Sequence, residues 1–200
     1  MRKYLKREKR IRNFTFLIYE ESMKSDWKER ISELALPCFC IYHNKDVSED
    51  GDLKKPHYHI LFLMDSMHSR NQITEIVEYI GGANGIYKDV INSKSYARYL
   101  CHLDNPEKHR YSVEDVISFG GLDYCRYIVT ESDRVRVVKE IIEFCDVKKM
   151  YNYADLMVYS KDNNNVWFNA LCGFTGRAVR EYIRSRNWEY YRKWNVSGRQ

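Results

Sequence analysis

The sequence has no apolar run that approaches the roughly 20 residues of a membrane-spanning helix. Its basic opening, MRKYLKR, is not followed by the apolar segment of a secretory signal peptide. It also has no internal repeat and no low-complexity tract. These absences argue against a membrane, secreted or repeat protein, and they predict a cytoplasmic protein without membrane contact.

A repeated cysteine spacing is also lacking. The six cysteines are scattered along the chain: Cys38, Cys40, Cys101, Cys125, Cys145 and Cys172. In a cytosolic chain of this size, such a distribution predicts reduced and mostly buried thiols rather than a disulfide framework.

The chain is long enough and apolar enough to fold. Its 200 residues are 44% hydrophobic, which suffices for one sizeable domain or for a small domain with an accessory one. The net charge of +5 is unevenly distributed, with one basic run at 2–12 and an arginine cluster near the other end (Arg177, Arg180, Arg184 and Arg186). Such patches suit the phosphate backbone of nucleic acid, and solvated tails are the alternative.

The first 130 residues alternate between strand-like and helix-like patterns. Strands are expected at 13–19, 38–43, 56–63 and 85–90, and helices at 26–34, 69–80 and 93–103. Ser25, Ser69 and Ser93 are the expected N-caps. The order predicts an α+β fold of the ferredoxin-like kind, an antiparallel sheet with helices on one face.

The pattern changes after Thr130. Segments 131–147, 152–159 and 165–194 have helical character and are separated by polar breaks. We therefore expect two domains, a mixed one at 1–130 and a small all-helical one at 131–200.

Two histidines two residues apart, His57 and His59, open an apolar strand. Alternate residues of a strand face the same side, so both imidazoles should lie together, opposite Tyr58 and the helix-covered core. The preceding strand ends at His43, and Asp46 follows it. Three imidazole nitrogens and a carboxylate would suit a divalent cation such as Mn²⁺, placed on the open face of the sheet.

Two alternatives compete with this metal site. Most His-x-His pairs are surface or packing histidines. A structural zinc would instead combine His57 and His59 with Cys38 and Cys40. Strand parity argues against the zinc site, because both cysteines should face the helix-covered side.

Two tyrosines follow on the expected helix at 93–103. Tyr96, Tyr99 and Leu103 share one helical face, which is either core or a place for a nucleophilic hydroxyl. A tyrosine beside a cation could attack a phosphodiester in line, and its phosphate ester would preserve the free energy for a reverse step.

Several motifs occur in an order that resembles the RepB-type initiators of small rolling-circle plasmids, a branch of the HUH endonucleases. They are the opening strand NFTFLIYEES followed by SDW, then HNKD, KKPHYHILF and YARYLCHLDNPEKHRY. The resemblance covers most of the first 130 residues. The helical tail is less specific, but its position suits the oligomerisation module of such initiators.

The resemblance implies roles for individual residues. The metal ligands would be His43, Asp46, His57 and His59, holding Mn²⁺ or Mg²⁺. The nucleophile would be Tyr99, the tyrosine before the leucine of the YLxH segment, rather than Tyr96. The sequence departs slightly from the pattern, because Asn44 stands where some relatives carry an acid.

The implied function is a metal-dependent, site- and strand-specific DNA nickase and strand transferase that starts rolling-circle replication. It would bind duplex origin DNA and the single-stranded nick site, leave a free 3′-OH and a 5′-phosphotyrosine, and act as a homo-oligomer. Residues in or near the motifs could contact phosphates: Lys45, Lys54, Lys55 and Arg98. A relaxase, a transposase or a non-catalytic origin-binding repressor are the alternative functions.

Overall fold

The chain forms two compact units, Met1–Ile128 and Val129–Gln200, and each has its own hydrophobic core. The computed structural model describes residues 9–48, 50–82, 85–173 and 175–197, with side chains as far as Trp188. Most of the basic run at 2–12 lies outside the described residues.

The first unit is built on an antiparallel sheet with the strand order β4-β1-β3-β2-β5. Its strands are β1 (Ile11–Tyr19), β2 (Cys38–His43), β3 (His57–His68), β4 (Lys88–Val90) and β5 (Ile117–Phe119). The sequence pattern predicts the first four of these, although β4 is shorter and β3 longer than expected. It does not predict β5, because three residues carry too little periodicity.

The register of the central strands fixes which residues share a face. Residue His43 of β2 pairs with His57 of β3, and Ile41 pairs with His59. The opposite face carries Cys40 and its partner Ile60. The predicted strand parity is therefore confirmed.

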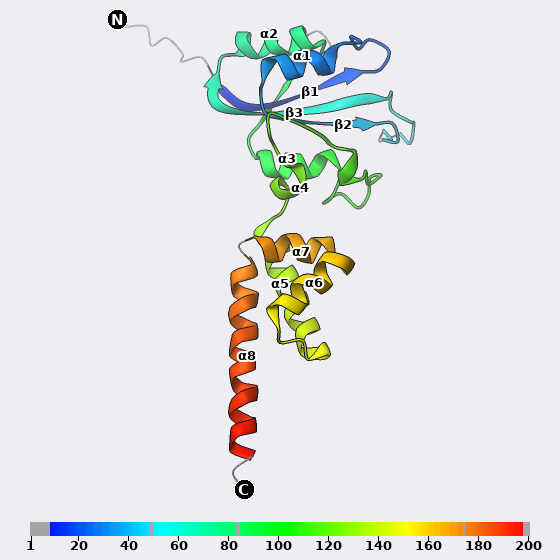
Figure 1. Cartoon of the computed structure of the whole chain (residues 1–200). Coiled ribbons are helices and arrows are strands. Elements are labelled where there is room, and N and C mark those ends of the chain that lie inside the picture. Colours follow the sequence, from blue (N-terminus) through cyan, green and yellow to red (C-terminus); the bar gives the residue numbers. More distant parts are fainter. Residues whose placement is uncertain (1–8, 49, 83–84, 174, 198–200) are drawn as a thin grey trace, which may run out of the picture. The chain divides into compact units, whose positions relative to one another are not determined.

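Helices α1 (Trp27–Leu34) and α2 (Arg70–Ile80) cover the face opposite the histidines (Figure 1). Ser69 caps α2, since its Oγ accepts from the Gln72 amide while the Gln72 side chain accepts from the Ser69 amide. In α1 the N-cap is Asp26 rather than Ser25. Apolar side chains of both helices pack against Phe14, Phe16 and Phe62.

The α+β class is confirmed, but the expectation of helices on one face only is wrong. Helices α3 (Ser93–Leu100) and α4 (Tyr124–Tyr127) lie against the histidine face (Figure 1). Ala97 and Leu100 of α3 pack with Phe39 and Leu61 of the sheet in a second core. This face is therefore covered along part of its length. The expectation that the histidines lie on an open face is also wrong, because all three are buried and His59 lies against the tyrosines of α3.

The second unit contains only helices among its described residues. They are α5 (Glu131–Lys148), α6 (Tyr153–Asn163), α7 (Asn165–Cys172) and α8 (Thr175–Ser197). Their core joins Val137 and Ile141 of α5 to Leu156, Leu171 and Val179. The segment expected as one helix at 165–194 is two, because α7 ends at Cys172 with Gly173 as its C-cap.

Candidate metal and nucleophile site

The three predicted histidines come together at one end of β2 and β3. One ring nitrogen from each of His43, His57 and His59 lies within 4.8 Å of the others, and all three residues are buried. The ring centroid of His43 lies 5.5 Å from that of His57 and 5.4 Å from that of His59. Adjacent strands supply this cluster, so its spacing follows from the sheet register.

The tautomer of His43 is set by its neighbours. Its Nε2 lies 2.7 Å from the Leu100 carbonyl oxygen and must donate to it. Burial lowers the pKa of His43, so the ring is neutral at pH 7 and Nδ1 keeps its lone pair. That Nδ1 is buried without a hydrogen-bond partner and faces the Asp46 Oδ2 at 3.2 Å. Two electron-rich atoms at this distance need a cation or a proton between them.

In His57 and His59, too, a hydrogen bond to one ring nitrogen orients the imidazole. The Nδ1 of His57 lies 2.8 Å from the Lys55 carbonyl oxygen and donates to it, which leaves the Nε2 lone pair available to a ligand. The Nε2 of His59 lies 2.8 Å from the Tyr96 hydroxyl. Burial lowers the pKa of His59 well below its usual value, so this imidazole is also neutral. Neutral, oriented imidazoles are what metal binding requires.

Asp46 belongs to a second group that shares His43 with the first. One ligand atom from each of His43, Asp46 and His102 lies within 4.8 Å of the others. The Tyr111 hydroxyl donates to Asp46 Oδ1 at 2.9 Å, and its ring stacks on His43 with a centroid distance of 4.4 Å. Burial raises the pKa of Tyr111 to about 12, so the hydroxyl stays protonated and keeps donating.

His102 and Tyr111 are the functional neighbours that the sequence reasoning did not assign. Both lie within the segment YARYLCHLDNPEKHRY that carries the family resemblance. The imidazole of His102 is buried, and its Nδ1 donates to the His109 carbonyl oxygen at 2.7 Å. The signal was present in the motif, but only the structure shows that both residues contact the group of His43 and Asp46.

Helix α3 brings both tyrosines to the histidines. The Tyr96 hydroxyl contacts His59, as above, and burial raises the pKa of Tyr96. The Tyr99 ring lies edge-on to His59, with centroids 6.2 Å apart, and 5.1 Å from His102. Its hydroxyl oxygen accepts from Lys108 Nζ at 2.7 Å. The two hydroxyls therefore have different partners, although the rings are 5.6 Å apart.

The four basic residues expected at phosphates differ in their surroundings. Lys45 and Lys54 have exposed side chains in the connection between β2 and β3. Lys55 Nζ pairs with Glu21 at 2.7 Å, so part of its charge is already offset. Arg98 uses Nε and one terminal nitrogen to bind Asp104, both at 2.7 Å, and another to bind the Ile128 carbonyl oxygen at 2.9 Å. These contacts favour a structural role for Arg98.

The expected arginine cluster near the C-terminus divides between two environments on α8. Arg177 and Arg184 are exposed, and the Arg180 guanidinium lies over the Tyr153 ring at 4.7 Å. Arg186 instead binds Asp146 at 3.3 Å within the second unit. The exposed part of the cluster is thus smaller than the sequence indicates.

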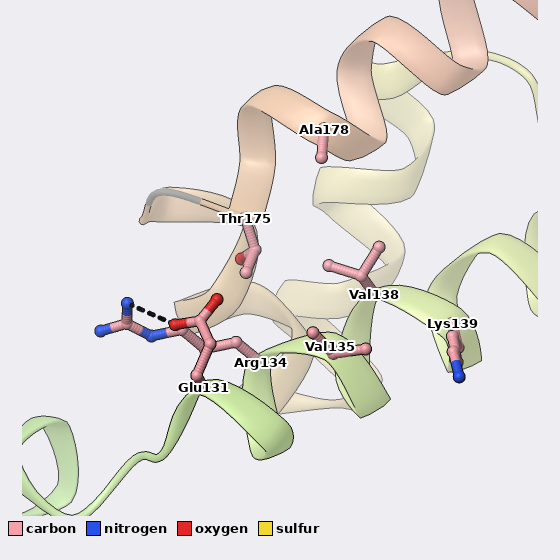
Figure 2. A pocket seen from close by; sticks show the side chains of 7 residues that line it. All are labelled: Glu131, Arg134, Val135, Val138, Lys139, Thr175 and Ala178. Carbon is pink, nitrogen blue, oxygen red and sulfur yellow. Dashed lines mark hydrogen bonds and ion pairs between the residues drawn. The ribbon is translucent and has the colours of Figure 1, made fainter.

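The second unit also has a groove of about 470 Å³ between α5 and α8. Figure 2 shows Val135 and Val138 of α5 facing Thr175 and Ala178 of α8, with Glu131, Arg134 and Lys139 at the border. The ion pair between Glu131 and Arg134 spans 3.4 Å. Neither of the candidate metal groups in the described residues lies in this lining.

The donor set of the first unit fits a divalent metal ion. His43, His57 and His59 each have one ring nitrogen engaged and another left for a ligand bond, and the buried Nδ1 of His43 faces a carboxylate. The cysteines Cys38 and Cys40 pack on the other face, in the first core. In the described part of the chain, both candidate metal groups consist of histidine and aspartate alone.

Comparison with known proteins assigns the chain to the plasmid replication initiators. It belongs to the family described as "Plasmid replication protein, origin binding domain", which matches residues 6–124. An origin-binding domain acts on DNA, so DNA is a partner of the first unit. None of the helices in the described ranges has the length and apolar composition needed to cross a bilayer.

Similar proteins match along nearly the whole chain. A "Replication protein" of Staphylococcus aureus is 35% identical over 189 residues, which is 92% of this chain and 93% of that protein. "Replication protein RepB" of Lactiplantibacillus plantarum is 31% identical, covering 90% of this chain and 83% of its own length. A protein of the same name from Streptococcus agalactiae is 24% identical over 90% of this chain and 88% of its own.

Proposed function

We propose that the first unit is a divalent-metal-dependent, strand-specific DNA nickase and strand transferase that starts rolling-circle replication. The observation that carries this proposal is that a cluster of potential metal ligands lies next to a candidate nucleophile. The buried cluster of histidines with Asp46 lies beside a helix that presents Tyr99. A DNA-binding initiator that only recognised its origin would have no use for this arrangement.

The metal ligands in this proposal are His43, Asp46, His57 and His59. Three nitrogen donors and one carboxylate oxygen suit Mn²⁺ better than Mg²⁺, which prefers oxygen ligands and retains its water. When bound, the ion would polarise a phosphoryl oxygen of the DNA and offset negative charge that develops during the reaction. The carbonyl oxygens of Leu100 and Lys55 hold the His43 and His57 rings in the orientation that binding needs.

Tyr99 is the proposed nucleophile. Its oxygen forms a bond to phosphorus while the bond from phosphorus to the 3′ oxygen breaks, which leaves a 3′-OH and a 5′-phosphotyrosine. Attack by a DNA hydroxyl reverses the step and joins strands without ATP. Tyr96 suits this role less, because burial raises its pKa and its hydroxyl is engaged with His59.

Two kinds of DNA contact accompany the chemistry. The origin would be bound as duplex and the nick site as single strand. The exposed side chains of Lys45 and Lys54 lie in the connection that carries Asp46, where they could contact phosphates. Paired Lys55 and internally bound Arg98 are weaker candidates for this contact.

We also infer that the second unit joins copies of the chain. The groove between α5 and α8 offers an apolar surface, and Val135 is 48% exposed there. An initiator with several copies would hold the origin through more than one binding unit and gain affinity without new contacts in each unit.

The experiment that tests the nickase uses the whole protein. Supercoiled plasmid that carries the replicon of this chain is incubated with Mn²⁺, with Mg²⁺ and with EDTA. We expect open-circular product with Mn²⁺, none with EDTA, and a protein–DNA adduct whose mass maps to the peptide of Tyr99. Origin binding without cleavage under every metal condition would contradict the proposal and support a repressor.

A further inference from the structure

A short connection after α3 places a lysine on the hydroxyl of Tyr99. This segment, 101–110, returns on itself because His102 donates to the His109 carbonyl oxygen at 2.7 Å. Arg98 of α3 donates two hydrogen bonds of 2.7 Å to the Asp104 carboxylate. The Lys108 amide donates to the Asn105 carbonyl oxygen at 3.1 Å. The position of Lys108 is therefore fixed by contacts at several points along the segment.

The side chain of Lys108 makes two contacts with Tyr99. Its Nζ donates to the Tyr99 hydroxyl oxygen at 2.7 Å and lies 4.5 Å from the centre of the ring. An ammonium group has donors only, so the tyrosine oxygen must accept, and the proton of its own hydroxyl must point elsewhere. No ion pair between Lys108 and a carboxylate is present among the described residues. The short contact of Lys108 Nζ is therefore with this oxygen, and its charge also acts on the neighbouring Glu107 carboxylate.

We propose that Lys108 is a catalytic residue: its ammonium group stabilises the negative charge on the Tyr99 oxygen during nicking and during joining. This inference rests on the proposed function. In nicking, the tyrosine oxygen bonds to phosphorus, the bond from phosphorus to the 3′ oxygen breaks, the tyrosine proton passes to solvent and the 3′ oxygen takes up a proton. Joining runs the same steps backwards, with the Tyr99 oxygen as the leaving group.

The expected loss of rate on removing the Lys108 ammonium group depends on how exposed this group is to solvent. Removing a single charge-stabilising donor from an enclosed active site slows reactions by about 100- to 1000-fold. Lys108 is exposed, so water screens part of its charge. We therefore expect a loss of about 10- to 100-fold when the ammonium group is removed. Because the same oxygen attacks and leaves, both directions should slow by a similar factor.

The test compares Lys108→Met, Lys108→Arg, Lys108→Ala and a matched control. Lys28 also lies over aromatic rings of the first unit, 5.5 Å from the Trp27 centroid and 5.8 Å from that of Tyr58, but on the opposite face of the sheet. Lys28→Met therefore removes the same charge and a similar ring contact away from the site. Oligonucleotides tiled across the replicon identify the nick site, and single-turnover cleavage is measured with saturating protein and Mn²⁺.

We expect Lys108→Met to bind the nick-site oligonucleotide normally, to cleave it about 10- to 100-fold more slowly, and to join it more slowly by a similar factor. Lys108→Arg should recover most of the rate, because the charge and the donors remain. Small primary amines added to Lys108→Ala should restore part of it. A purely structural role would not respond to added amine. Lys28→Met should cleave as the wild type does.

Three results would overturn the inference, and they can be told apart. Wild-type cleavage by Lys108→Met, with Tyr99→Phe inactive, would remove Lys108 and leave the proposed function standing. A weaker affinity with an unchanged saturated rate would show that Lys108 holds a DNA phosphate instead. Absence of cleavage by the wild-type protein would remove the proposed function and this inference with it. Circular dichroism of each variant separates a chemical loss from unfolding.

Discussion

At the scale of single residues, the site distinguishes two tyrosines that the sequence places on one helical face. Tyr96 is bound to His59 and Tyr99 to Lys108. In-line attack on a phosphodiester tolerates little misplacement of the attacking oxygen. The partner of each hydroxyl therefore matters more than the face of the helix on which its ring lies.

The first prediction separates these tyrosines. Tyr99→Phe keeps the ring and removes only the oxygen, so it should fold and bind the nick-site oligonucleotide but give neither cleavage nor covalent adduct. Tyr96→Phe should still cleave. Peptide mapping of the adduct checks both variants, and a phosphotyrosine at Tyr96 would refute the assignment.

The second prediction concerns the metal. Mn²⁺ at about 100 times its Kd should stabilise the chain by about 2.7 kcal/mol, which corresponds to a rise of several degrees in Tm, because the ion binds only the folded form. His57→Ala and His59→Ala should lose this shift, and EDTA should reverse it in the wild type. His68→Ala is the control, since His68 ends the same strand and bonds to Ser66. An undiminished shift in the double mutant His57→Ala/His59→Ala would refute the ligand set.

At the scale of elements, pairing with β2 and a tight turn at Gly120 stabilise the three-residue strand β5. It pairs with β2, and the chain then turns at Gly120, where φ is +65°. A Cβ at this position would lie 2.7 Å from the Cα of Pro37, which immediately precedes β2. Both the backbone conformation and the close approach require glycine.

The third prediction uses this turn. Gly120→Ala should lower the free energy of unfolding by about 2–4 kcal/mol, because a strained left-handed conformation is added to a backbone clash. Gly121→Ala is a matched control: its φ is +74°, but no atom lies within 4 Å of the added Cβ. It should cost about 1 kcal/mol. Urea unfolding measures both, and equal losses would show that the contact with Pro37 does not matter.

In the second unit, the end of α5 is tied to α8 through Asp146. Its carboxylate accepts from Tyr182 at 2.6 Å and from Tyr151 at 3.1 Å, and it pairs with Arg186 at 3.3 Å. The hydrogen bond from Tyr182 is the main cause that holds the pKa of Asp146 below its usual value.

The fourth prediction follows from the sign of that shift. A carboxyl whose pKa is lowered by folding adds stability above its unfolded pKa of about 4, and this stability is lost as the pH falls through the lower, folded pKa. Asp146→Asn should therefore destabilise the chain near neutral pH and flatten the dependence of its stability on pH between about 2 and 5. Asp162→Asn, at the exposed end of α6, is the control. Urea unfolding followed by circular dichroism at several pH values should show the difference, and parallel curves for wild type and Asp146→Asn would contradict it.

At the scale of the whole molecule, each of the two units should fold independently of the other. The Ile128 carbonyl oxygen accepts from Arg98 of the first unit, whereas the Thr130 hydroxyl oxygen accepts from the Asp133 amide and caps α5 of the second. The boundary between the two units therefore lies within the three residues from Ile128 to Thr130.

The fifth prediction tests this division. A fragment of residues 1–130 should fold and should nick single-stranded DNA at the rate of the whole chain. It should bind duplex origin less tightly than the whole chain and sediment as a monomer. The full chain should sediment as an oligomer. An identical assembly state for fragment and full chain would remove the proposed role of the second unit.

Local rules allowed much of this protein to be read from its sequence. Strand parity placed Cys38 and Cys40 on one face and the histidines on the other, because the alternation of a strand does not depend on the rest of the fold. The serine cap of α2 and the start of the helical tail were equally local. The motifs that resemble the RepB-type initiators indicated the family, which the comparisons show.

Only the tertiary structure decided what lies beside these residues. It placed α3 over the histidine face, split the tail at Gly173, and paired β5 with β2. It also brought Tyr111 onto His43 and Lys108 onto Tyr99. These contacts join residues across connections without a regular repeat, so no periodicity in the sequence could predict them. Their positions follow from apolar packing, ring stacking and hydrogen bonds that exist only once the chain has folded.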